Sequence, residues 1–332
     1  EVERILQEEA DLIEERYPEL KRNVSGYNLD WLVEDARGAS RGVGEPDAEG
    51  GTINLAKLLC GSEGTLAVVT EATVSLEPVP ETKGMALLAY ESLGEAMSDV
   101  APIVAHDPAA TEVIDDVLLD LARETAEFAP VTEMLPDGTG AVLIVEFYAD
   151  SDSEARQKVT TLLGDRLPGY DSSGGAGKGT SRREPSEGTS EHDGDVRAFD
   201  AIEAYDEASR AKIWKLRKSG LPILLSRTTD EKHASFIEDT AIPPENLPSF
   251  VSDFQAILEA HDTYASFYAH AGPGVLHIRP LVNTKSADGI ETMASIADAV
   301  TDLVVEYDGS VSGEHGDGRA RTQWNRKLYG EE

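Results

Sequence analysis

The spacing of apolar residues over the first eighty positions predicts helices followed by strands. In Glu1–Leu20 apolar residues recur at the three- and four-residue intervals of an amphipathic helix. A short helix is expected again at 54–59, and two β-branched runs, Leu66–Thr70 and Ala72–Leu76, predict strands. Prolines end this pattern at Pro80, so we place a domain boundary there and expect a first domain over 1–80.

Beyond residue 80, strand and helix patterns alternate. The expected elements are a strand at Met85–Tyr90, a helix at Leu93–Ala105, a strand running into a helix at Glu112–Leu121, a strand at Ala141–Tyr148 and a helix at Ser153–Leu167. This order favours an α+β domain in which helices cover one face of a sheet. A second domain is expected over 81–305, with 306–332 as a returning C-terminal segment.

The second half repeats this unit. Its expected elements are helices at Val196–Leu216, Leu247–Ala260 and Ile290–Val305, and strands at Ser235–Ile242, Ser266–Tyr268 and Val275–Pro280. Between the halves, residues 171–195 consist of glycine, serine and charged residues without a hydrophobic period. We expect this segment to be a disordered insertion.

Charge excludes several kinds of partner. Acidic residues number 63 and basic ones 29, so the formal net charge is 29 − 63 = −34. Nucleic acid is excluded as a partner because phosphate binding needs a basic surface. The longest apolar run, Ala141–Val145, is too short for a transmembrane segment, and the single cysteine, Cys60, rules out an internal disulfide. The acid excess predicts a halophilic cytoplasmic protein, with an ordinary acidic protein as the alternative.

Two glycine-flanked polar motifs hold three of the seven histidines. The first contains His270 and His277 around a Gly-Pro-Gly turn, and the second is Ser-Gly-Glu314-His315-Gly-Asp-Gly. Two imidazoles and a carboxylate, His270, His277 and Glu314, form a reasonable ligand set for a divalent metal. His315 is then free to act as a base. The alternative is that these loop residues only hydrogen-bond within their turns.

Two further groups could bind a ligand. Between a helix and a strand lie Gly61, Ser62, Glu63, Gly64 and Thr65, whose backbone N–H groups could cradle phosphate or a flavin edge; an ordinary tight turn is the alternative. Arg217, at the end of an amphipathic helix, could hold a substrate carboxylate through two hydrogen bonds, or could simply face solvent.

Taken in order, these motifs resemble one family. GSEGTLAVVTEATVSL (61–76) resembles the flavin-contacting segment of FAD-linked oxidases of the vanillyl-alcohol-oxidase type. The segments SGYNLD (25–30), IWKLRKSG (213–220), FIEDTAIPPENLPSF (236–250), HAGPGVLHIRP (270–280) and SGEHGDGRA (312–320) resemble its D-lactate, glycolate and D-2-hydroxyglutarate dehydrogenase branch. These sequences are most similar to those of long family members, in which the flavin half is fused to an iron–sulfur half.

The resemblance implies a fold, cofactors and roles. It implies part of an FAD-binding subdomain over 1–80, and a cap domain with an antiparallel sheet covered by helices. His270, His277 and Glu314 match the metal ligands, with zinc expected and manganese as the alternative. His315 matches the catalytic base and Arg217 the arginine that holds the substrate carboxylate, while residues 61–65 match FAD contacts.

The implied reaction is oxidation of a D-2-hydroxy acid with hydride transfer to FAD. Arg279 stands where the D-2-hydroxyglutarate branch has asparagine, and Ile237 where it has lysine, although Lys232 is nearby. These departures favour D-lactate or another short substrate. We expect the missing flavin segment and an iron–sulfur half or subunit as partners, and a cytoplasmic protein that an electron-transfer partner could hold at the inner face of the membrane. A catalytically incomplete metal-binding cap domain and a scaffold paired with a separate flavin-binding chain are the alternatives.

Overall fold

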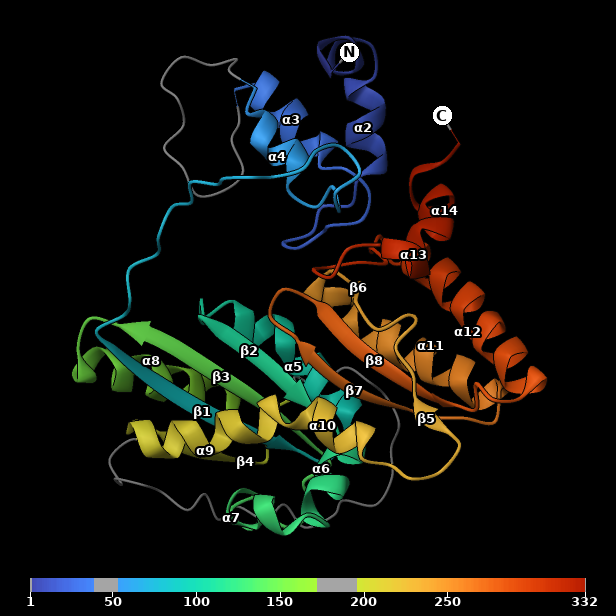
Figure 1. Cartoon of the computed structure of the whole chain (residues 1–332). Helices are drawn as coiled ribbons and strands as arrows, with labels where there is room; N and C mark the ends of the chain where they lie inside the picture. The colour runs from blue at the N-terminus through green and yellow to red at the C-terminus, as the bar shows by residue number, and fades with distance from the viewer. Residues whose placement is uncertain (1, 39–52, 172–195, 332) are drawn as a thin grey trace.

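A small group of N-terminal helices lies beside a large sheet with helices on both sides (Figure 1). The computed structural model describes residues 2–38, 53–171 and 196–331. The disordered insertion expected at 171–195 therefore falls almost wholly outside the described residues.

In the described part of 1–80, four short helices form the N-terminal group. They are α1 (Val2–Glu8), α2 (Ala10–Arg16), α3 (Leu29–Ala36) and α4 (Leu55–Leu59), packed around Leu6, Ile13, Leu32 and Val33. The single helix expected over 1–20 is wrong in its extent. Glu9 has a non-helical backbone conformation between α1 and α2, and Tyr17 is extended because Pro18 follows it.

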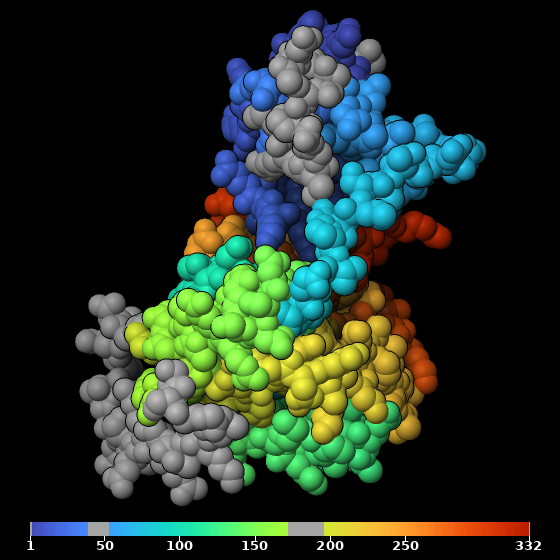
Figure 2. Space-filling model, turned by 90° about the vertical axis from the view of Figure 1, so that its left-hand side faces the viewer, coloured from blue at the N-terminus to red at the C-terminus, as the bar shows by residue number. Residues whose placement is uncertain are grey.

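The strands expected at 66–70 and 72–76 are wrong. The segment has no regular structure, and its apolar side chains are exposed, Val68 and Leu76 to 88% each. A strand needs a neighbour for its backbone hydrogen bonds, and the described part of the chain places none beside this segment. Figure 2 shows the segment as a protruding ridge between the N-terminal helices and the rest of the molecule.

Within the described residues eight strands form the sheet, and every pairing among them is antiparallel. Their order is β4-β1-β3-β2-β7-β8-β5, and β6 also pairs with β8. The strands are β1 (Thr82–Tyr90), β2 (Ala110–Ile114), β3 (Ala141–Ala149), β4 (Asp200–Ala204), β5 (Lys232–His233), β6 (Thr240–Ala241), β7 (Ala265–His270) and β8 (Val275–Val282).

A repeated unit underlies this order, as the sequence predicts. The first copy runs β1-α5-β2-β3-α8 and the second β6-α11-β7-β8-α12, so that β2 and β7 meet at the centre of the sheet. The helices are α5 (Leu93–Val104), α8 (Asp152–Arg166), α11 (Leu247–Ala260) and α12 (Ala287–Glu306). Ser92 and Ser151 cap α5 and α8 in the same way, each accepting a hydrogen bond from the N–H three residues on.

Two expected elements are wrong in part. The helix at 196–216 is instead the edge strand β4 followed by α9 (Glu207–Lys218), which Asp206 caps. The three-residue spacing of apolar residues at the start of this segment is typical of a helix. These residues instead form a strand because they pair with the edge of β1. The strand expected at 235–242 is reduced to β6, because Pro243 follows it and cannot continue the hydrogen-bond ladder. The short strand β5 lies before β6 in the chain.

Helices cover both faces of the sheet, which corrects the expected single face. One face packs on α5, α8, α11 and α12 around Leu88, Met97 and Phe250. The other packs on α6 (Asp116–Arg123), α7 (Ala129–Thr132), α9 and α10 (Gly220–Leu225) around Leu87 and Leu118. Buried on both sides, β1 and β3 therefore read as continuous apolar runs.

The C-terminal segment connects the sheet to the N-terminal helices. Ser310 bridges to Ala241 of β6, and the Ser312 carbonyl accepts a hydrogen bond from the N–H of Val24. The short helices α13 (Gly318–Arg321) and α14 (Asn325–Tyr329) follow, joined by the 3-10 turn η3 (Thr322–Trp324). The other 3-10 turns, η1 (Ala126–Phe128) and η2 (Pro244–Asn246), lie earlier in the chain. The glycine-rich loop 312–318 is thereby held between the two parts.

No helix in the described residues is both long enough and apolar enough to cross a bilayer.

Candidate active site

Charged and imidazole side chains cluster on one sheet face beyond the end of α9. Glu112 of β2 is directly opposite His270 of β7, and Tyr268 of β7 is directly opposite His277 of β8. Because side chains two apart on a strand share a face, Arg279 lies on this side as well, as the sequence predicts for His277 and Arg279.

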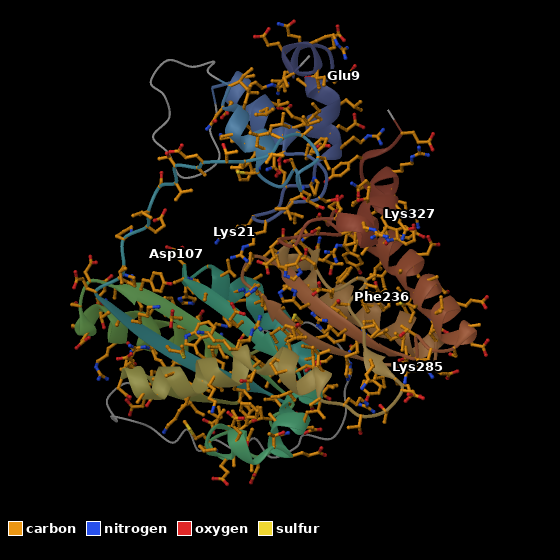
Figure 3. All side chains as sticks on the ribbon, viewed as in Figure 1. Glu9, Lys21, Asp107, Phe236, Lys285 and Lys327 are labelled. Atoms are coloured by element: carbon orange, nitrogen blue, oxygen red, sulfur yellow. The ribbon has the colours of Figure 1, made fainter. Side chains whose placement is uncertain are left out.

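The three predicted metal ligands converge. Oε1 of Glu314 lies 3.2 Å from Nε2 of His270 and 3.2 Å from Nε2 of His277. The other carboxylate oxygen of Glu314 accepts a hydrogen bond from Arg22 at 2.6 Å. In Figure 3 Lys21, the neighbour of Arg22, lies between the N-terminal helices and the sheet. Residues from three distant segments therefore meet at one point.

Each histidine is oriented through its second ring nitrogen. Nδ1 of His270 lies 2.8 Å from Oε1 of Glu112, and Nδ1 of His277 lies 3.0 Å from the backbone carbonyl of Glu238. Metal-binding histidines are held in this way by carboxylates and backbone carbonyls, which direct the other nitrogen at the ion.

Close packing of acids and imidazoles shifts their pKa values. Burial lowers the pKa of His277, but hydrogen bonds to Glu238 and Glu314 outweigh it and raise that pKa to about 9. The hydrogen bond from His277 lowers the pKa of Glu314 to about 2, against the opposing effect of burial. This cluster of carboxylates therefore favours a positive charge at its centre.

Asp239 organises the loop that carries Glu314 and His315. Its buried carboxylate accepts hydrogen bonds from the Ser312 hydroxyl at 2.7 Å and from the backbone N–H of His315 at 2.8 Å. Asp239, His277, Glu314 and His315 also have ligand atoms within 4.8 Å of one another. We favour the set with His270 over this one, because the Asp239 oxygens are already satisfied by the loop.

His315, the predicted base, joins the cluster. Its ring stacks on that of His277 with centroids 5.2 Å apart and planes 10° from parallel. Nδ1 of His315 lies 3.0 Å from Oε1 of Glu238, and 45% of its side chain is exposed. The ring is thus oriented by a carboxylate while remaining accessible.

Arg217, the predicted carboxylate-binding residue, reaches the site from α9. Its Nε donates to Oε2 of Glu112 at 2.9 Å, and its guanidinium lies 5.1 Å from the ring centre of Tyr268. Its Nη2 is buried without a hydrogen-bond partner among the described residues. A buried guanidinium N–H without an acceptor is costly, so this position suits an anionic ligand.

The segment predicted to contact FAD lies against the glycine-rich loop 312–318. Both Glu63 oxygens accept from the backbone N–H of Gly318, at 3.0 and 3.1 Å. The Ser62 and Thr65 hydroxyls donate to carbonyls within the turn, to Leu59 and Ser62 respectively. Gly61 and Gly64 both have positive φ angles, +79° and +75°, which their lack of a side chain allows.

Sequence reasoning missed several residues that hold the site together. They are Glu112, Glu238, Asp239, Tyr268, Arg22 and Arg321, the last of which donates from Nη2 to the Gly316 carbonyl at 2.7 Å. A signal was present for the acids, because Glu112 and Glu238 lie within apolar strand-like runs where a charged residue must be paired if it is buried.

Known proteins resemble this chain along nearly its whole length. The model of the C-terminal domain of FAD linked oxidases matches residues 79–332. D-2-hydroxyglutarate dehydrogenase of Pantoea ananatis is 30% identical over 328 residues, 98% of this chain and 29% of that protein. Glycolate oxidase subunit GlcD of Bacillus subtilis is 27% identical over 275 residues, 82% of this chain and 50% of that protein.

The match of the domain model to residues 79–332 establishes the family. The fold and the domain model define an FAD-linked oxidase C-terminal domain, and the chain belongs to the FAD-linked oxidase family. It spans only about 29% of the length of the D-2-hydroxyglutarate dehydrogenases that it matches. Among solved structures, an alkyldihydroxyacetonephosphate synthase aligns with a TM-score of 0.46 at 15% identity, covering 83% of this chain and 48% of that one.

Proposed function

We propose that this chain carries the substrate site of an FAD-dependent dehydrogenase that oxidises a D-2-hydroxy acid to the 2-oxo acid. The observation that carries the proposal is the convergence of His270, His277 and Glu314 beside the buried Arg217. A 2-hydroxy acid has a carboxylate next to its hydroxyl, and the site offers a guanidinium for the first and an imidazole base for the second.

The donor set fits a divalent metal. Two Nε2 atoms and one carboxylate oxygen face one another, and the remaining nitrogen of each histidine is held by protein oxygens. Two histidines and one carboxylate suit zinc, with manganese as the alternative. When bound, the metal would supply a Lewis acid for the substrate hydroxyl.

FAD is the proposed hydride acceptor, and residues 61–65 are its proposed contacts. A Cβ added at Gly64 would meet nothing within 4 Å, so a flat ring could approach the backbone there. The remaining FAD contacts are proposed to come from outside these 332 residues. When bound, FAD would accept the hydride from the substrate α-carbon.

His315 is the proposed base for the hydroxyl proton. Glu238 holds its Nδ1, which leaves Nε2 on the accessible side of the ring. The carboxylate thereby fixes the orientation of the ring, so that Nε2 can accept the hydroxyl proton. Arg217 is proposed to fix the substrate carboxylate through its unpaired Nη2.

D-lactate or another short D-2-hydroxy acid is the first proposed substrate. Arg279 is already engaged, since its Nε donates to the Tyr268 hydroxyl at 2.8 Å and its Nη2 lies 3.3 Å from Glu238. It is therefore not free for a second carboxylate. The names of the relatives favour D-2-hydroxyglutarate as the second candidate.

Substrate binding tests the proposal. Calorimetric titration of the zinc-loaded chain with D-lactate and with D-2-hydroxyglutarate should show that Arg217→Lys weakens binding about ten-fold or more, because lysine lacks the planar pair of donors. The matched control is Arg210→Lys, since Arg210 donates to the backbone carbonyls of Lys83 and Tyr205, away from the site. Equal binding by wild type and Arg217→Lys would overturn the role of Arg217, and no binding of either acid would overturn the proposal.

The cellular setting is proposed from composition and resemblance. We propose a halophilic, cytoplasmic protein that passes electrons to an iron–sulfur partner. The large acid excess supports the halophilic part of this proposal.

A further inference from the structure

Glu112 occupies an unusual position for a carboxylate. It lies in the middle of the sheet on β2, next to Val113, and only 6% of the residue is exposed. A buried carboxylate is costly unless every oxygen finds a donor, and here each does. Oε1 lies 2.8 Å from Nδ1 of His270, and Oε2 accepts from Nε of Arg217 at 2.9 Å.

We infer that Glu112 is a positioning residue that aligns the metal-binding and carboxylate-binding halves of the site. This inference rests on the proposed function. An ionised carboxylate only accepts hydrogen bonds, so His270 must carry a proton on Nδ1. Nε2 of His270 is thereby the nitrogen directed at Glu314, 3.2 Å away, as a metal ligand requires.

The same carboxylate fixes Arg217. By accepting from Nε it sets the rotation of the planar guanidinium, whose Nη2 then remains for a ligand. Its negative charge also compensates the buried guanidinium. A single side chain thus determines where the metal ligand His270 and the carboxylate-binding Arg217 point relative to each other.

A glutamine at this position cannot do both. Its oxygen can accept from Arg217, but its NH2 group would then face Nδ1 of His270. The imidazole relieves this clash by moving its proton to Nε2, which leaves Nδ1 as an acceptor and removes the lone pair that would bind a metal.

The chain provides a matched control on the adjacent strand. Glu146 of β3 is also buried between a cation and a ring N–H. Its carboxylate accepts from Nζ of Lys83 at 3.0 Å and from Nε1 of Trp214 at 2.9 Å. It lies on the same sheet face but contacts none of the proposed ligands, so Glu146→Gln reproduces the loss of a buried charge without touching the site.

The experiment compares wild type, Glu112→Gln and Glu146→Gln, each checked for folding by circular dichroism. Zinc affinity is measured by chelator competition, and the protonated ring nitrogen of His270 by long-range 1H–15N spectra of 15N-histidine protein, assigned with a His270→Asn variant. Glu112→Gln should bind zinc about ten- to a hundred-fold more weakly and should move the His270 proton from Nδ1 to Nε2. Glu146→Gln should leave both unchanged.

The two readouts separate the possible failures. If wild type binds no zinc, the metal part of the proposed function is wrong, while the metal-free spectra still decide the role of Glu112. If His270 keeps its proton on Nδ1 in Glu112→Gln, or if Glu146→Gln weakens zinc binding equally, Glu112 is not a positioning residue.

Discussion

The Glu63 carboxylate accepts a hydrogen bond from the backbone N–H of Gly318, 255 positions away, at a distance of 3.0 Å. Glu63 belongs to the proposed FAD segment, and Gly318 ends the loop that carries His315. A Cβ at Gly316 would lie 2.3 Å from Oε1 of the same carboxylate. The absence of a side chain at Gly316 is therefore what lets the two segments meet.

Gly316→Ala should displace the Glu63 carboxylate. Gly316 has a φ of +82°, so alanine adds backbone strain of about 1–2 kcal/mol, and loss of the Glu63 bond adds about 1 kcal/mol. The control is Gly138→Ala, because Gly138 has a φ of +86° with nothing within 4 Å of the added Cβ. Urea unfolding should show that Glu63→Ala costs nothing further in the Gly316→Ala background; additive losses would contradict the shared contact.

A buried ion pair should make a large contribution to stability. Asp99 accepts from Nε of Arg166 at 2.7 Å and from the Tyr90 hydroxyl at 2.5 Å. Asp99→Ala removes the fully buried carboxylate of this ion pair, at a cost of about 3–5 kcal/mol in the free energy of unfolding. Asp165→Ala removes a half-exposed carboxylate that lies 3.8 Å from the same arginine and 3.0 Å from Nε2 of His106, and it should change stability by less than about 1 kcal/mol. Similar losses in the two variants would refute this account.

The pH dependence of stability should contain a contribution from Asp115, the N-cap of α6. Burial raises its pKa to about 7, although N–H groups of Phe267 and Leu118 oppose the shift. The folded state therefore holds this proton up to about pH 7, whereas the unfolded chain loses it near pH 4. Stability from this group is complete below pH 4 and is lost as the pH rises toward 7, by at most about 4 kcal/mol.

Asp115→Asn removes this titration. The difference in unfolding free energy between wild type and Asp115→Asn, measured by denaturant titration at several pH values, should change between pH 4 and 7 and level off above it. A constant difference across that range would show that Asp115 is ionised in the folded state throughout.

High salt should stabilise the fold. At a net charge of −34 the folded chain repels itself, and molar KCl shortens the Debye length to about 3 Å. Far-UV circular dichroism should show loss of helical signal in dilute buffer and its recovery in molar KCl. Identical spectra in the two conditions would count against halophilic adaptation.

Elements with strong local signals could be predicted closely from the sequence. The helix expected at Leu247–Ala260 has those bounds in the structure, because Pro243 and Pro244 end the preceding strand and its apolar period is regular. The runs at 66–76 have equally strong β-branched patterns but form no strand. Strand formation depends on a partner, and periodicity alone does not reveal whether one is present.

The site residues also divide into those that a local motif marks and those that only the tertiary structure brings into the site. His270, His277 and Glu314 could be named because glycine-flanked polar motifs and a family resemblance mark them. Glu112 could not be linked to His270, since the two are 158 positions apart and only the pairing of β2 with β7 brings them together. Its role arises from sheet topology, which local patterns do not specify.

Metal content is the most direct test of the metal-binding substrate site proposed for His270, His277 and Glu314. Protein purified in high salt with zinc supplied should be analysed by elemental mass spectrometry, comparing wild type, His277→Ala and the distant control His261→Ala, whose ring contacts the Ile257 carbonyl and the Ser295 hydroxyl. The account predicts about one equivalent of zinc in wild type and in His261→Ala, and its loss in His277→Ala. A folded wild type without metal, or a His277→Ala variant that retains it, would contradict the account.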